Sequence, residues 1–176
     1  MTEHEGYSSR GNHATGARAS KYLVWRVGER VFATPLSHIR EIIAMPPMTD
    51  LPEFHRMLKG VFNLRGKIIS VADVRTKLAG NGPGVVHVKR PYVIALEAAG
   101  CEIGVVVDDI VEVILVAQQD IKKDIDVQSS TRIDQRYVEG VFSRPGNAML
   151  VMILDMPHLL GVGVAPETHR PVAAVA

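Results

Sequence analysis

The sequence predicts an all-β chain folded into two small, pseudo-symmetric β-barrels with a few short helices. Short runs rich in β-branched and aromatic residues alternate with glycine-containing turns. The second half of the chain also repeats the first. One copy alone, about 60 residues, has a small core and open strand edges. Two copies packed together, each curled into a barrel, remove both weaknesses.

A β-hairpin is predicted at the start of the structured chain. The runs YLVWRV (22–27) and RVFATP (30–35) flank a tight turn at Gly28-Glu29. Two β-rich runs around a short glycine-containing turn are typical of a hairpin.

A short helix is predicted directly after this hairpin, in PLSHIREII (35–43). Thr34 is a candidate N-cap, and Pro35 suits the first helical turn. Apolar residues follow at helical spacing, namely Leu36, Ile39, Ile42 and Ile43. We therefore expect Glu41 to lie on a helix.

Two further elements complete the first copy. MPPMTDLPE (45–53) interrupts regular structure. After GVFNLRG (60–66), the run KIISVAD (67–73) is predicted to be a strand, and VRTKLAG (74–80) a short helix or turn.

The second half repeats this order of segments. A hairpin around Ala99-Gly100 corresponds to the first hairpin, and GVFSRPG (140–146) corresponds to GVFNLRG. Glu112 then corresponds to Glu41. The offset grows from 70 residues at Tyr22 and Tyr92 to 80 at Gly60 and Gly140. The second copy therefore carries a longer central insertion, at about residues 116–136.

The ends of the chain differ in composition from the middle. Residues 1–20 and 163–176 lack apolar periodicity, and we expect a flexible N-terminal arm and a flexible C-terminal tail. The structured domain is expected to span residues 21–162, with GNGPG (80–84) as a connector between the two copies.

Composition narrows the class of protein. The chain has 176 residues, 47% of them apolar and 22% charged, which is typical of a globular protein. A formal net charge of +1 and 5% aromatic residues argue against a nucleic-acid binder. The single cysteine, Cys101, excludes an intrachain disulfide. No apolar stretch is long enough for a membrane span, so we expect a cytoplasmic location without direct membrane insertion.

No catalytic or metal-binding pattern stands out. The histidines are scattered, without metal-ligand spacing to another histidine, cysteine or carboxylate. Neither a nucleophile motif nor a phosphate-binding loop is present. We expect no enzyme activity, no metal and no cofactor. A binding module, which works through surface shape and a few anchoring residues, fits better.

Arg65 in GVFNLRG is the most informative candidate for a binding residue. In the second copy Pro145 takes its place and Ser143 takes the place of Asn63, so the repeat does not require an arginine there. Arg65 is then either a solvated cation at a strand end or the partner of a carboxylate across the barrel. Glu41 is the carboxylate that we select.

Four stretches together resemble the CheW family of bacterial chemotaxis coupling proteins. GVFNLRGKIISVADVRTKLAG resembles the family signature. The other three resemble further family segments in the same order, and they are YLVWRVGERVFATPLSHIREII, EIGVVVDDIVEVI and YVEGVFSRPGNAMLVMILDMPHLLG. The resemblance extends from Lys21 to Gly161 and implies a pair of SH3-like barrels.

The resemblance also implies a function and a binding site. Family members are non-catalytic scaffolds that couple transmembrane chemoreceptors to the histidine kinase CheA, in arrays at the inner face of the membrane. The expected partners are a CheA-type kinase and the cytoplasmic tips of methyl-accepting receptors. The matching protein-binding residues are Ile39, Glu41, Asn63, Leu64, Arg65 and Gly66. The alternative is a signalling domain that binds a small ligand in the groove between the barrels.

Overall fold

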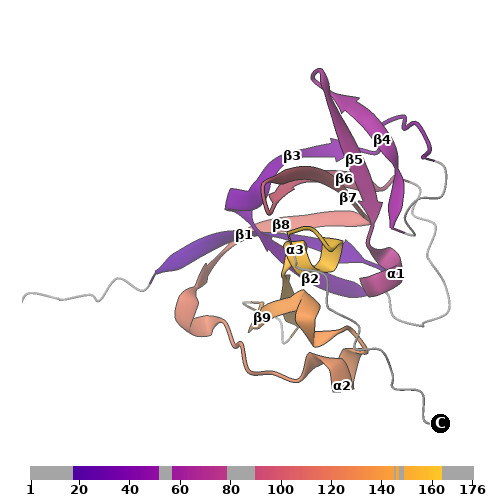
Figure 1. Cartoon of the computed structure of the whole chain (residues 1–176). Helices are drawn as coiled ribbons and strands as arrows, with labels where there is room; N and C mark the ends of the chain where they lie inside the picture. The colour runs from indigo at the N-terminus through magenta and orange to yellow at the C-terminus, as the bar shows by residue number, and fades with distance from the viewer. Residues whose placement is uncertain (1–17, 52–56, 79–89, 145, 147–148, 164–176) are drawn as a thin grey trace, which may run out of the picture.

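The structure is a computed structural model, shown in Figure 1. It describes residues 18–51, 57–78, 90–144, 146 and 149–163. The GNGPG connector, most of the N-terminal arm and most of the C-terminal tail lie outside these residues. The first strand begins at Ala19, so Ala19 and Ser20 belong to the sheet rather than to the predicted arm.

The described strands form two five-stranded sheets, as the repeat predicts. The sheet of lobe 1 has the order β8-β1-β2-β10-β9 and that of lobe 2 the order β3-β6-β7-β5-β4. In lobe 1 the strands are β1 (Ala19–Val27), β2 (Arg30–Pro35), β8 (Asp109–Ala117), β9 (Val138–Ser143) and β10 (Leu150–Leu154). In lobe 2 they are β3 (Ile39–Ala44), β4 (Leu58–Leu64), β5 (Lys67–Asp73), β6 (Tyr92–Ala98) and β7 (Cys101–Val107).

The two copies of the repeat exchange strands. Each sheet joins the hairpin of one copy, β1-β2 or β6-β7, to the three later strands of the other copy. The exchanged strands meet in parallel, β10 on β2 and β5 on β7, whereas the other pairings are antiparallel. Neither copy therefore forms a lobe alone, and Figure 1 shows the lobes one above the other.

Each sheet closes into a barrel at a pair of backbone hydrogen bonds. Thr49, after β3, exchanges N–H···O bonds of 2.8 and 2.9 Å with Val61 of β4. Lys122, after β8, exchanges two bonds of 2.8 Å with Val141 of β9. In lobe 2 the segment around Thr49, which closes the barrel, passes so near Gly60 that a side chain at position 60 would not fit. A Cβ at Gly60 would lie 2.6 Å from Thr49 O.

The lobes share one core and have one small core each. Alternate residues of a strand face opposite sides of its sheet. In β1, Leu23 and Trp25 enter the shared core between the sheets, whereas Tyr22 and Val24 enter the barrel of lobe 1. Phe62 is buried in the corresponding barrel of lobe 2. Burial on both faces explains why these strands are almost continuously apolar.

The predicted helix at 35–43 is wrong. Leu36–His38 forms a single 3-10 turn, η1, and β3 follows as a strand that pairs with β6. Thr34 caps nothing, because it is buried and its Oγ1 accepts a 3.1 Å hydrogen bond from Trp25 Nε1. Burial alternates along β3, with Ile39, Glu41 and Ile43 partly buried and Arg40, Ile42 and Ala44 exposed. The apolar residues resemble a helical spacing because Glu41 takes an inward position and Ile42 an outward one.

Short helices follow the last strand of each copy. These are α1 (Arg75–Leu78) after β5 and α3 (Met156–Leu160) after β10. Asp73 and Asp155, which the two copies share, accept hydrogen bonds from backbone N–H groups of these helices. The insertion of the second copy holds η2 (Gln118–Asp120), α2 (Val127–Thr131) and η3 (Gln135–Tyr137). Within the described residues, no helix is long and apolar enough to span a membrane.

Candidate functional site

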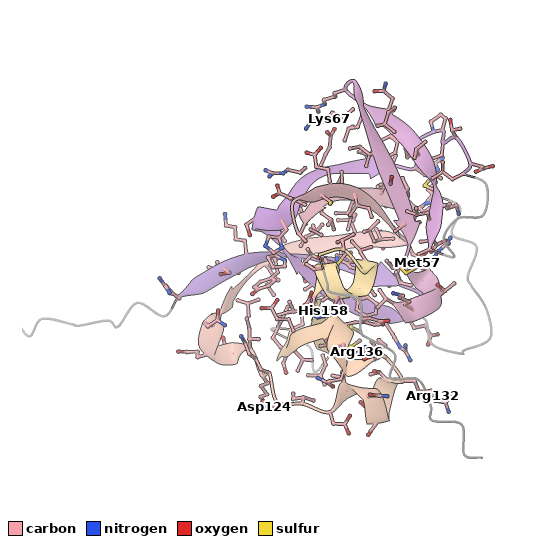
Figure 2. The ribbon with its side chains drawn as sticks, viewed as in Figure 1. Met57, Lys67, Asp124, Arg132, Arg136 and His158 are labelled. Carbon is pink, nitrogen blue, oxygen red and sulfur yellow. The ribbon has the colours of Figure 1, made fainter. Side chains whose placement is uncertain are left out.

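The β4-β5 hairpin of lobe 2 carries most of the predicted site. Leu64 pairs with Lys67, so Arg65 and Gly66 form a two-residue turn. Both turn residues have positive φ, 52° and 89°, as a type I′ turn requires. Asn63 stabilises this turn, since its Oδ1 accepts a 2.7 Å hydrogen bond from Gly66 N. Figure 2 shows Lys67, the next residue, at the tip of the hairpin.

Arg65 occupies a position that the backbone does not favour for arginine. Glycine, asparagine and aspartate are the usual residues in left-handed turn positions, because other side chains crowd the backbone there. The Arg65 side chain is 80% exposed, so core packing does not compensate for this cost. The turn fixes where the guanidinium is presented, but it does not explain why an arginine is there.

Glu41 and Arg65 form the predicted pair. Arg65 Nη2 donates to Glu41 Oε1 over 3.0 Å, joining β3 to the hairpin tip. The Glu41 side chain is 32% exposed and Arg65 far more so. Ion pairs this open to water contribute little to stability. The pair therefore orients two charges at the surface more than it stabilises the fold.

The six predicted site residues do not form one cluster. Glu41, Asn63, Arg65 and Gly66 meet at the hairpin tip. Leu64 is partly buried against the core of lobe 2 and supports the tip from inside. Ile39, at the start of β3, packs against the shared core instead. It lies on a strand rather than on the expected helix.

Exposed apolar side chains next to the pair were not predicted. Ile68 is 67% exposed and pairs across the hairpin with Asn63. Ile42, which follows Glu41, is also exposed. Strand alternation was the signal that could have identified Ile68, because Phe62 and its partner Ile69 point inward and the next pair must then point outward.

Lobe 1 carries a second glutamate-arginine pair that sequence comparison missed. Arg144 Nε lies 2.6 Å from Glu112 Oε1, the counterpart of Glu41. The two atoms are close enough for an ion pair but do not form a hydrogen bond. Glu112 Oε1 is buried and has no hydrogen-bond partner. Comparison of the copies placed Pro145 opposite Arg65, and Pro145 lies outside the described residues. The arginine of the second copy stands one residue earlier in this alignment, at Arg144.

The outer face of lobe 1 resembles that of lobe 2 in a second way. Leu150 pairs with Ser143 as Ile68 pairs with Asn63, and it is 55% exposed. Val113, the counterpart of Ile42, is exposed as well. Each lobe therefore presents an acid-arginine pair beside exposed aliphatic side chains.

Two hollows flank the chain crossover between the lobes. The larger, about 550 Å³, is lined by Tyr22, Pro35 and Leu36 among others. The smaller, about 250 Å³, is lined by Arg40, Glu97 and Pro157 among others. Ser37 and His38 line both. Ile39 follows directly in the chain, but its side chain packs against the shared core and lines neither hollow. Among the described residues, no cluster of three or more histidines, cysteines or carboxylates could hold a metal ion.

Comparison with known proteins identifies the fold and the family together. The CheW-like domain matches residues 21–163. The chain belongs to the CheW-like family. A scaffolding protein CheW from Thermoanaerobacter tengcongensis superposes with a TM-score of 0.72 at 26% identity, covering 86% of this chain and 94% of that protein. It has two SH3-like barrels, as does the present chain.

Relatives with assigned names agree with this membership. The chemotaxis protein CheW of Rhizobium meliloti is 27% identical over 135 residues, covering 76% of this chain and 83% of its own length. That of Klebsiella aerogenes is 26% identical over 140 residues, covering 80% and 81%. CheW-like proteins are non-catalytic scaffolds of chemotaxis signalling, and the chain is such a scaffold.

Proposed function

We propose that this chain couples transmembrane chemoreceptors to a CheA-type histidine kinase in arrays at the inner face of the membrane. The observation that carries the proposal is the Glu41-Arg65 pair at the tip of lobe 2. Its arginine is highly exposed on a turn that disfavours it, and the strands that carry the pair also carry the exposed Ile42 and Ile68. Backbone strain of this kind persists where function requires it.

The tip of lobe 2 is the proposed contact with the kinase. Ile42 and Ile68 are the proposed apolar contacts, and the Glu41-Arg65 pair supplies the proposed charged contact. Protein interfaces commonly combine a small apolar centre with oriented charges around it. The corresponding face of lobe 1 offers a second contact of the same kind, so one chain is able to join two neighbours in an assembly.

The groove between the lobes is the proposed contact with the receptor. A helical receptor tip binds in a groove on its partner. The two hollows at the crossover combine apolar side chains such as Leu36 with polar ones such as Ser37 and His38. We assign Ile39 to this contact and the hairpin tip to the kinase contact.

Reconstitution tests the proposal. The full chain is mixed with a CheA-type kinase and the cytoplasmic fragment of a chemoreceptor, and co-sedimentation and kinase autophosphorylation are measured. The three proteins should co-sediment, and receptor control of the kinase should require this chain. Arg65→Ala should weaken kinase binding at least tenfold, about 1.4 kcal/mol.

Arg26→Ala is the matched control. Arg26 also forms an exposed ion pair, with 2.9 Å between its Nη2 and Asp109 Oδ2, but it lies in lobe 1. This variant should bind the kinase normally. Absence of kinase and receptor binding by the wild-type chain would refute the proposal, and a metabolite co-purifying from the groove would favour a ligand sensor instead.

A further inference from the structure

An arginine of lobe 2 reaches a buried carboxylate where the chain crosses from β7 to β8. Arg75, the first residue of α1, lies with its Nη1 3.9 Å from Oδ1 of Asp108, the residue between these two strands. The two side chains are only 13% and 6% exposed. Asp108 Oδ2 accepts a 2.7 Å hydrogen bond from Gly28 N in the β1-β2 turn of lobe 1, whereas its buried Oδ1 has no hydrogen-bond partner. Arg75 therefore places a cation beside a buried acid that is already bonded to lobe 1.

Two further contacts connect α1 to lobe 1. Lys77 Nζ donates a 2.8 Å hydrogen bond to Leu159 O of α3 and lies over the Tyr137 ring, 4.9 Å from its centroid. Arg30 of β2 donates from Nη1 to Leu78 O, at the end of α1, over 2.7 Å. Figure 1 shows α1 where the two lobes meet. Polar contacts with lobe 1 therefore run along the whole of this short helix.

The crossover from β2 to β3 is the equivalent place in the repeat, and the charged residues are missing there. Ser37 corresponds to Asp108, since each stands four residues before the glutamate that the two copies share. Pro157 corresponds to Arg75, since each stands two residues after the shared aspartate. Ala99 is the first residue of the corresponding hairpin turn. Both members of the ion pair are thus replaced together.

A hollow of about 250 Å³ lies where the ion pair would be. Ser37, Pro157 and Ala99 all line it. The Arg40-Glu97 ion pair lines it too, but both of these residues belong to lobe 2. Within the part of the chain that the structure describes, no side chain of α3 makes a hydrogen bond or ion pair to a strand of lobe 2. Charged side chains therefore join the lobes at one crossover and not at the other.

The shared core holds the lobes together but does not by itself fix the angle between them. Apolar burial is non-directional and depends mainly on the area removed from water. Hydrogen bonds and buried ion pairs require particular distances and angles, and selecting one arrangement is the best-attested use of buried polar groups. The contacts of α1 are therefore the ones that fix the angle between the lobes.

We propose that Arg75 and Lys77 fix the lobes to each other at the β7-β8 crossover, and that the lobes pivot there while the interface at Ser37 and Pro157 opens and closes. Both cations are positioning residues, because they set where the two lobes stand relative to each other. The interface that moves is the one that carries the hollow. The proposal concerns the chain alone and does not depend on its partners.

The distance between the lobes tests the proposal. Two spin labels are attached in the Cys101→Ser background, one at Lys67→Cys on the tip of lobe 2 and one at Ser143→Cys on the exposed end of β9 in lobe 1. The distribution of distances between the labels is then measured in frozen solution. Arg75→Met/Lys77→Met should broaden this distribution about twofold, because the core remains while the contacts that fix the angle are lost.

A second variant moves the ion pair to the other crossover. Ser37→Asp/Pro157→Arg places an acid and an arginine at the equivalent positions of the repeat. Added to Arg75→Met/Lys77→Met, these two substitutions should narrow the distribution again, because the lobes are then joined at the β2-β3 crossover. A distribution that stays broad would contradict the proposal that a charged pair at a crossover fixes the lobes.

Val24→Ala is the control for lost stability. Val24 is buried in the barrel of lobe 1, outside the shared core, so this variant is destabilised without losing a contact of α1. Its distribution of distances should match that of the wild type. Equal broadening in Val24→Ala and in Arg75→Met/Lys77→Met would overturn the proposal, since the effect would then be general loosening. An unchanged distribution after the loss of Arg75 and Lys77 would also overturn it and show that the apolar core alone fixes the angle.

Discussion

The two lobes carry the same acid-arginine pair in different settings. In lobe 1 the Arg144 side chain is 32% exposed and reaches a glutamate whose contacting oxygen is buried. In lobe 2 Arg65 is 80% exposed and stands on a left-handed turn. The recurrence shows that the fold provides a carboxylate on β3 or β8 and room for an arginine near the following hairpin. The difference shows that lobe 2 presents its arginine to solvent far more fully than lobe 1 does.

The largest expected effects on stability come from substituting Gly60 and Gly140, the glycines at which the two barrels close. Gly60→Ala should destabilise the protein by about 3 kcal/mol, because its Cβ would lie 2.6 Å from the backbone oxygen of Thr49. Gly140→Ala should cost less, about 1–2 kcal/mol, since its nearest contact is a side-chain methyl group of Ile121 at 2.8 Å and the nearest backbone atom, Lys122 O, is farther away at 3.2 Å. Urea unfolding measures both, and the reverse order would contradict this account of barrel closure.

The next largest expected effect on stability concerns the ion pair between Arg75 and Asp73. Arg75 is nearly buried and donates from Nε to Asp73 Oδ1 over 2.8 Å, whereas the other copy has Pro157 in its place. Arg75→Met should cost about 2 kcal/mol at pH 7, because it leaves a partly buried carboxylate with Lys59, at 3.9 Å, as its remaining cation and the backbone N–H of residue 75 as a donor. The exposed Arg26→Ala should cost less than about 1 kcal/mol.

The Arg75 variant also predicts a pH dependence. Burial alone would raise the pKa of Asp73, but the hydrogen bonds and charge of Arg75 hold it below its usual value. A lowered folded-state pKa stabilises the protein above the unfolded-state pKa, about 3.9, and this contribution is lost as the pH falls further. The gap in unfolding free energy between wild type and Arg75→Met should therefore narrow below about pH 4. A constant gap would show that the pair does not act through charge.

The acid-arginine pairs themselves should show smaller effects on stability. Arg144→Ala should cost about 1 kcal/mol, because it leaves the buried Glu112 oxygen without its cation. Arg65→Ala should cost less, below about 1 kcal/mol, because its pair is open to water. Chemical unfolding of the two variants compares the lobes directly. A larger loss of stability from Arg65→Ala than from Arg144→Ala would show that Arg65, rather than Arg144, is the structural arginine.

Much of this architecture could be predicted from sequence, because the repeat tests each expectation twice. Both hairpin turns and the Glu41-Arg65 pair were predicted, and the structure contains them. The strand at 39–44 was missed, since Glu41 on the partly buried side and Ile42 on the exposed side give the apolar residues a helix-like spacing. Strand exchange was not predictable, because each hairpin has the same pattern and either set of later strands would satisfy it.

The second acid-arginine pair escaped prediction for a different reason. In lobe 2 the paired residues nearest the turn are Leu64 and Lys67, whereas in lobe 1 they are Ser143 and Leu150. This longer connection lets an arginine one position earlier in the alignment reach the equivalent glutamate. An alignment that matches positions one by one does not show that Arg144 takes the place of Arg65. The pair becomes visible only when side chains are placed in space.

The claim that the lobe 2 tip serves binding rather than folding is tested most directly by a double-mutant cycle. Glu41→Ala, Arg65→Ala and the double variant are compared with wild type, in kinase binding and in urea unfolding. Arg65→Ala should weaken binding at least tenfold while unfolding changes by less than about 1 kcal/mol. The exchange Glu41→Arg/Arg65→Glu should restore part of the binding if the pair acts as a unit, and none if Arg65 meets an acid on the kinase. If Arg65→Ala instead unfolds the chain while the remaining folded fraction binds normally, Arg65 is a structural residue and the central claim is wrong.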